Sequence, residues 1–141
     1  MRRAAVALVA ITALAGCNDD AAPGGIHSPE GVMIRDWLMA VEHYDFSHAA
    51  DFFAPGAIID QSGPPHRLRD RRAARLFNAT LPCRANLIAL DDEGAKVLAT
   101  FRLKPGPGGD CGGRVRVRYT IVDGRFTEWR QLRRGRTGPT I

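Results

Sequence analysis

The hydrophobic pattern of this 141-residue chain changes its period once, near residue 84, and this change limits the folds open to it. Before that point apolar residues recur at three- and four-residue spacing, which indicates amphipathic helices. After it they alternate with polar residues, which indicates strands with one buried face. Helices followed by a run of strands predict an α+β fold, in which N-terminal helices pack on a curved antiparallel sheet.

Three helices are expected in the first part. The run "SPE" at residues 28–30 combines a capping hydroxyl with a proline at the first helical position, and the apolar spacing after it predicts a helix to about Tyr44. A short second helix is expected around "SHAADFF", ended by "APG" at residues 54–56. Asp70 is expected to cap a third helix that runs to about Leu81, before Pro82.

The expected strands are short and joined by turns or loops. They cover residues 57–61, 84–90, 96–103, 114–122 and 125–132, with a loop at "SGPPHRLR" and another at residues 105–113. The last two strands should form a hairpin about Asp123-Gly124, a dipeptide that favours the tight turns of hairpins.

The N-terminus indicates export. After the positive "MRR" comes an apolar run of about ten residues, too short to span a bilayer but typical of a signal peptide. The junction "LAGC" at residues 14–17 resembles the lipobox of bacterial lipoproteins, in which the cysteine is acylated and the chain is cut just before it. Residues 1–16 are therefore expected to be a signal peptide, and acyl groups on Cys17 are expected to anchor the rest. An ordinary signal peptide with an incidental cysteine is the alternative.

The expected location in the cell envelope limits the possible binding partners. Asn18 after the cysteine favours the outer membrane of the bacterial envelope, with the domain facing the periplasm. Residues 17–27 are expected to be the lipidated cysteine and a flexible tether, 28–134 one domain, and 135–141 a basic tail. The net charge is +5, and it falls by two, to +3, without Arg2 and Arg3. Nucleic acid is not an expected partner, whereas phospholipid or another envelope polyanion is.

Two further cysteines, Cys83 and Cys111, suggest a disulfide in an oxidising compartment. The first expected hairpin, with its turn at residues 91–94, pairs Leu90 near Ala95 and brings Cys83 near Arg102. Both cysteines then lie at the same end of the sheet, and a bridge would keep the glycine-rich loop ordered. Two unpaired buried thiols are the alternative.

Two longer stretches carry a resemblance to a known family. "WLMAVEHYDFSHAADFFAPGAIID" and "YTIVDGRFTEW" resemble the opening and the last hairpin of nuclear transport factor 2-like (SnoaL-like) domains, and the similarity spans about residues 29–134. The resemblance implies a cone-shaped scaffold. That scaffold hosts isomerases, dehydratases, hydrolases and many non-enzymes, so it predicts a fold better than a function.

The ketosteroid isomerases of this family offer a direct test. They use a carboxylate base, and an oxyanion hole made of a tyrosine and a protonated aspartic acid. The resemblance places Trp37 at the tyrosine position, Gln61 at the base and Arg118 near the aspartic acid. None of the three can replace the family residue, so this chemistry is not expected here.

Other candidates for catalysis are weak. Asp60 and His66 could form an acid–base pair at the mouth of the cone, or Asp60 could cap the next turn while His66 is a solvated loop residue. His43, Asp45 and His48 do not share one helix face, so no metal site is predicted. No cofactor is expected.

Two groups of residues indicate binding. The residues expected to line an apolar pocket, or simply to form the core, are Trp37, Phe53, Phe101, Tyr119 and Trp129. Arginines gather at residues 67–75 and 130–136. Among them Arg71 and Arg75, one helical turn apart, could chelate an anion, although a solvated face is the alternative.

Together these observations predict a non-enzymatic, envelope-anchored lipoprotein that binds a small apolar or anionic ligand or acts as an accessory protein. A small-molecule enzyme of isomerase, dehydratase or hydrolase type, using Asp60 and His66, is the first alternative. A dimeric assembly module that pairs through its sheet is the second. An open cone would favour ligand binding, and a filled cone would exclude it.

Overall fold

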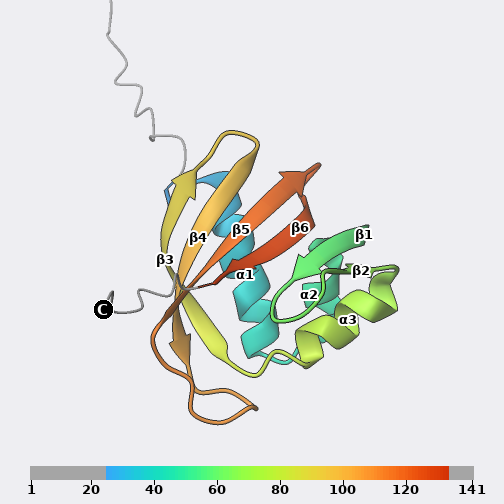
Figure 1. The fold of residues 1–141 in the computed structure, drawn as a ribbon, viewed down its shortest axis with the longest axis vertical. Helices are drawn as coiled ribbons and strands as arrows, with labels where there is room; N and C mark the ends of the chain where they lie inside the picture. Colours follow the sequence, from blue (N-terminus) through green and yellow to red (C-terminus); the bar gives the residue numbers. More distant parts are fainter. Residues whose placement is uncertain (1–24, 134–141) are drawn as a thin grey trace, which may run out of the picture.

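The computed structural model describes residues 25–133, which form helices packed on one curved, unclosed sheet (Figure 1). The predicted signal peptide, Cys17 and the basic tail lie outside the described residues. The elements, in chain order, are α1 (Pro29–Glu42), α2 (Phe46–Asp51), β1 (Phe53–Asp60), β2 (His66–Leu68), α3 (Arg71–Ala79), β3 (Arg84–Asp92), β4 (Lys96–Lys104), β5 (Arg114–Val122) and β6 (Arg125–Leu132). The α+β prediction is confirmed.

The sheet has the strand order β2-β1-β6-β5-β4-β3, and α1 lies across one of its faces (Figure 1). Every neighbouring pair is antiparallel except β1 and β6, which run parallel. The expected antiparallel sheet therefore contains one parallel pair. After β2, at one edge of the sheet, α3 carries the chain to β3 at the other edge.

The helix starts follow local capping. The Ser28 hydroxyl accepts a hydrogen bond from Gly31 N at 3.1 Å, and the Asp70 carboxylate accepts one from Ala73 N at 2.8 Å. Both caps satisfy backbone N–H groups that have no partner inside the helix, as predicted. The third helix ends at Ala79, two residues before the expected end.

Residues 25–28, just before α1, form a turn that packs against the domain. Ser28 N donates to the Gly25 carbonyl at 2.9 Å, and Ile26 packs against the core. Gly31 allows this turn, because a Cβ there would lie 2.4 Å from the Ile26 carbonyl oxygen. No helix among residues 25–133 is long and apolar enough to cross a membrane.

Two expectations about the first strands were wrong. β1 begins at Phe53 rather than at residue 57, because an irregularity that includes Gly56, at φ +79°, lets "APG" continue the strand. The segment expected to be a loop forms β2, in which His66 pairs with Ile59 and Leu68 with Ala57. A strand of three residues is too short to show alternation, and buried Leu68 holds it.

The predicted register of β3 and β4 was also wrong. Leu90 pairs with Ala99, and Arg84 with Lys104. The strands extend further toward the turn than expected, and one residue bulges between Leu87 and Ala89. The last hairpin agrees with its prediction, including positive φ angles at its two turn residues, Asp123 and Gly124.

The core lies between α1 and the inner face of the sheet and is rich in aromatic rings. Trp37 contacts Phe53, Tyr119 and Phe126 edge-to-face, with ring centroids 5.9–6.4 Å apart. Tyr119 and Phe126 are fully buried. Edge-to-face packing of this kind favours one arrangement of the core over others.

Candidate functional site

A cavity of about 160 Å³ opens between the second half of α1, residues 81–85 and the inner faces of β4, β5 and β6. The cone is therefore not filled. Aliphatic and aromatic side chains form most of its wall, among them Leu38, Val41, Phe101, Leu103 and Val115. A largely apolar wall with a few polar groups is typical of sites that bind small molecules.

Four of the five aromatic residues expected to line a pocket do so. Trp37, Phe101, Tyr119 and Trp129 contribute to the wall of the cavity. Phe53 does not. Its ring packs against Phe77 and Phe126 at 5.6 Å and 5.2 Å, so it belongs to the core alone.

Two buried polar groups of the cavity wall lack hydrogen-bond partners. The Tyr119 hydroxyl and Trp129 Nε1 are buried and make no hydrogen bond with any described residue. Burial raises the pKa of the Tyr119 phenol far above its usual range, and the nearby Trp129 indole N–H opposes that rise only in part. The phenol therefore stays protonated and can donate a hydrogen bond.

A third unpartnered group is the guanidinium of Arg84. Arg84 lines the cavity and is only 7% exposed, and neither Nη1 nor Nη2 has a hydrogen-bond partner among the described residues. The ring of Tyr44 lies beside it, with its centroid 4.9 Å from Arg84 Cζ. A buried cation without a carboxylate is unusual, because burying an unpaired charge is unfavourable.

Sequence reasoning missed Arg84. The residues after it, Ala85 and Leu87, pack against the core, so alternation along β3 places Arg84 on the same side as exposed Asn86. In the folded chain Arg84 is nevertheless buried, and the ring of Tyr44, which follows α1, lies beside its guanidinium. No periodicity within the strand could indicate that contact.

The cavity wall contains one carboxylate, that of Glu42. Its Oε1 is 3.0 Å from Lys104 Nζ, which already neutralises it. The side chains of Gln61 and Gln131 also contribute to the wall. Among the described wall residues, the fully buried polar atoms without a partner are donors on Arg84 and Trp129, together with the hydroxyl of Tyr119.

Known proteins of this shape exist, although no family model and no curated protein matches the chain. A Sinorhizobium meliloti protein described as a polyketide cyclase aligns over 72% of this chain and 94% of its own, with 19% identity and a TM-score of 0.60. A Kribbella flavida protein described as a ketosteroid isomerase aligns over 78% and 81%, with 16% identity and a TM-score of 0.57. A nuclear transport factor 2-like protein of unknown function from Cytophaga hutchinsonii aligns over 71% and 85%, with 9% identity and a TM-score of 0.58.

The chain has the nuclear transport factor 2-like fold. At these identities the likeness concerns the fold alone, and the residues of the site must be considered separately.

The positions that carry isomerase chemistry in this fold hold other contacts here. Trp37 Nε1 donates to Asn78 Oδ1 at 2.7 Å, so that N–H is already used. Gln61 lines the cavity but has no group to accept a proton and become an acid. Arg118 forms two hydrogen bonds to the carboxylate of Glu93, at 2.6 and 3.1 Å, and does not line the cavity.

The predicted acid–base pair of Asp60 and His66 is not formed at the cavity. Neither residue lines it. Asp60 accepts a hydrogen bond from Arg130 Nη1 at 3.0 Å, and His66 is exposed on β2 opposite Ile59. Because neighbouring strand residues point to opposite faces, Asp60 and His66 project from different sides of this nuclear transport factor 2-like sheet.

Of the predicted anion-binding pair Arg71 and Arg75, Arg71 forms an ion pair within the chain. Arg71 Nε is 2.7 Å from Asp51 Oδ1, and Arg71 Nη2 donates to the Ser47 carbonyl at 2.9 Å, which ties α3 to α2. The hydrogen bond from Arg71 lowers the pKa of Asp51. Arg75 is exposed on the surface of α3.

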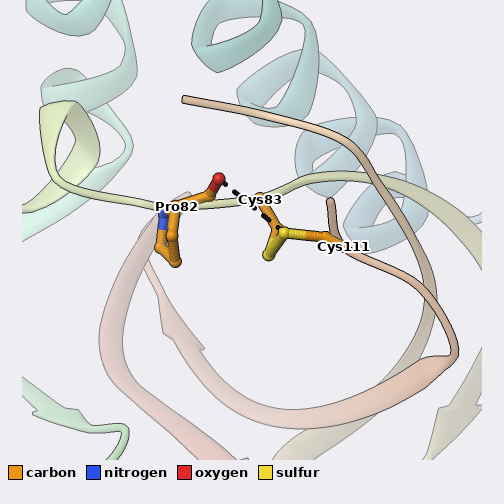
Figure 2. The surroundings of a disulfide bond; sticks show 3 residues. All are labelled: Pro82, Cys83 and Cys111. Atoms are coloured by element: carbon orange, nitrogen blue, oxygen red, sulfur yellow. Dashed lines mark hydrogen bonds between the residues drawn. A yellow bond between two sulfur atoms is a disulfide. The ribbon is translucent and has the colours of Figure 1, made fainter. Parts of the chain in front are cut away.

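The predicted disulfide is confirmed. Cys83 and Cys111 are bonded, with Cα atoms 5.7 Å apart, and Figure 2 shows the bridge beside Pro82. Gly108 N donates to the Pro82 carbonyl at 2.9 Å, so the glycine-rich loop is held to the same segment. Because Pro82 and Cys83 line the cavity, the bridge fixes part of its rim.

No cluster of three or more potential metal ligands occurs among residues 25–133. His43 Nδ1 lies 2.8 Å from the Met39 carbonyl oxygen, which requires that this nitrogen carry its hydrogen. The ring of His48 packs against Phe52 at 5.2 Å. These two histidines therefore have structural contacts of their own.

Proposed function

We propose that this chain is an envelope lipoprotein whose nuclear transport factor 2-like domain binds one small, largely apolar molecule without transforming it. The observation that carries the proposal is the unfilled cavity of about 160 Å³ with its aromatic and aliphatic wall. An apolar cavity of about 150 Å³ is large enough to hold benzene. The ligand would therefore bury one ring or a short alkyl chain.

The polar groups of the wall support binding rather than proton transfer. General acid–base catalysis needs a group that gains and loses a proton near neutral pH. The Tyr119 phenol is held protonated by burial, the Arg84 guanidinium has hydrogen-bond donors but no acceptor, and Glu42 is paired with Lys104. None of these groups is suited to accept a proton from a substrate.

The lipoprotein part of the proposal rests on the sequence. The junction at residues 14–17 and the polar stretch after Cys17 would place the domain a short distance from a membrane surface. There the cavity would meet molecules that enter or leave the envelope. The proposal assigns to the acyl chains the role of keeping this binding domain in that compartment.

Binding is tested with the neutral probe 2-(4-fluorophenyl)ethanol and the full chain in phospholipid nanodiscs, observed by fluorine NMR. Empty nanodiscs give the background from partitioning into lipid. Val115 lines the cavity, whereas Arg116, the next residue of β5, is exposed on the other face. Val115→Trp should therefore weaken saturable binding about tenfold or more, and Arg116→Trp, which adds the same ring outside, should not.

Far-ultraviolet circular dichroism establishes that both variants are folded, and Leu103→Trp offers a second way to fill the cavity from β4. The proposal fails if the wild-type chain binds neither this probe nor its carboxylate analogue above the empty-nanodisc background. It also fails if both cavity-filling variants bind as well as the wild type.

A further inference from the structure

We infer that the natural ligand is an organic acid, with its carboxylate held by Arg84 and its apolar body held by the wall of the cavity. The inference rests on the proposed function and adds the chemical class of the ligand. It assigns a binding role to a residue that no sequence pattern indicated.

The guanidinium of Arg84 is buried without a partner. A guanidinium buried to this extent is normally paired, because an unpaired buried charge is strongly unfavourable. Both Nη atoms lack hydrogen bonds, and the Tyr44 ring can satisfy only the face of the group. The N–H groups in the plane of the guanidinium remain free for an anion.

The protein itself does not supply that anion. Glu42 is the one carboxylate among the described wall residues, and its partner is Lys104. A bound carboxylate matches the guanidinium, since its two oxygens can accept two parallel N–H bonds. It would also remove the unpaired charge without any rearrangement of the Glu42–Lys104 pair.

The buried polar groups of the cavity wall include more hydrogen-bond donors than acceptors. Besides Arg84, the wall of the cavity includes Trp129 and Tyr119, whose buried indole N–H and hydroxyl lie near each other but make no hydrogen bond of normal geometry. A ligand that suits this set must carry acceptor oxygens. A carboxylate supplies them, whereas an ammonium group has donors and no acceptor.

The apolar wall of the cavity favours an organic acid over an inorganic anion. Phosphate or sulfate would be surrounded by Phe101, Leu103 and Val115, which offer no hydrogen bonds. With the cavity volume given above, the ligand would have roughly ten non-hydrogen atoms, the carboxylate included. Arylacetic acids and medium-chain fatty acids fit this description.

The test compares two probes with one carbon skeleton, 4-fluorophenylacetate and 2-(4-fluorophenyl)ethanol, in the nanodisc assay at pH 7. The wild-type chain should bind the acid roughly 10- to 100-fold more tightly than the alcohol, as expected for charge-assisted hydrogen bonds in a buried site. In Arg84→Met, which keeps an unbranched apolar stem but removes the guanidinium group and its charge, the ratio of the two affinities should fall to about one.

Arg116→Met is the matched control, because it removes the same charge from an exposed position of the sheet. It should keep the wild-type ratio. The unfolding midpoint of each variant shows whether it is folded, and Arg84→Lys serves as a second substitution that keeps the charge but loses the planar fork.

Equal affinities for acid and alcohol in the wild type would overturn the inference while leaving the proposed function intact. Loss of the acid preference in Tyr119→Phe, with its retention in Arg84→Met, would also overturn it, because the acid would then bind at Tyr119. Failure of both probes to bind would instead refute the proposed function.

Discussion

The indole N–H of Trp37 on α1 donates a 2.7 Å hydrogen bond to Oδ1 of Asn78 on α3, and both side chains are buried. Asn78 Nδ2 in turn donates to the Ala74 carbonyl at 2.8 Å. The two helices, 41 residues apart in the chain at these positions, are thus joined by a fully satisfied polar contact inside an aromatic core.

Asn78→Ala should therefore destabilise the fold. It removes both hydrogen bonds of the side chain and leaves the Trp37 N–H buried without a partner, at a cost of about 1–3 kcal/mol in the free energy of unfolding. Urea denaturation measures the change. Asn86→Ala, at an exposed position of β3, is the control and should change the free energy by less than about 0.5 kcal/mol. Equal effects of the two substitutions would contradict this account.

The glycine-rich loop should tolerate alanine at one glycine and not at another. A Cβ at Gly108 would lie 2.5 Å from Pro82 Cβ, whereas a Cβ at Gly112 would meet nothing within 4 Å. Gly108→Ala is expected to lower the free energy of unfolding by about 1–3 kcal/mol, because the loop must move away from the segment that carries Cys83. Gly112→Ala should lower it little or not at all. Thermal unfolding of the two variants distinguishes these outcomes.

Reduction of the Cys83–Cys111 bond should lower the thermal stability without abolishing the fold. The bond closes a loop of 28 residues, which corresponds to roughly 3–4 kcal/mol in the chain-entropy model. The aromatic core around Trp37 does not depend on it. The double variant Cys83→Ser, Cys111→Ser should behave like the reduced protein and bind the probes more weakly, since part of the cavity rim is released. Titration of thiols on Cys83 and Cys111 in denatured protein purified without reductant would refute the bridge.

An acid-sensitive ion pair is expected on the outer face of the sheet. Hydrogen bonds from Arg130, and then from Lys96, lower the pKa of Glu128. The pair therefore contributes stability that is fully present above the unfolded-state pKa of about 4.3 and is lost as the pH falls through the lower folded-state pKa. Arg130→Met should raise the pKa of Glu128 measured by NMR titration and flatten the decline of stability in acid. Arg116→Met, also in the sheet, should leave that pKa where it is in the wild type.

Cys17→Ser tests the anchor. The proposed acylation needs the thiol, so the variant should incorporate no labelled palmitate and should remain uncleaved or become soluble. The wild type should be labelled and should fractionate with the membrane. Normal processing and membrane retention of the variant would show that residues 14–17 are not a lipobox.

The sequence determined the elements whose signals are local. The caps at Ser28 and Asp70 and the turn at Asp123-Gly124 are interactions between residues a few positions apart, so the first and third helices and the last hairpin could be placed in advance. The resemblance to nuclear transport factor 2-like domains indicated the fold for the same reason, because the motifs that carry it include these elements. The predicted oxidising compartment, together with two cysteines besides Cys17, suggested the disulfide.

Only the tertiary structure decided whether β2 forms, how β3 pairs with β4, and which polar groups lie in the wall of the cavity. β2 exists because three residues find a partner in β1, and the register follows from a bulge that no alternation marks. Arg84 shows the reason most clearly. It is buried and contacts Tyr44, forty residues earlier in the chain, so its surroundings arise from contacts that only the folded chain can make.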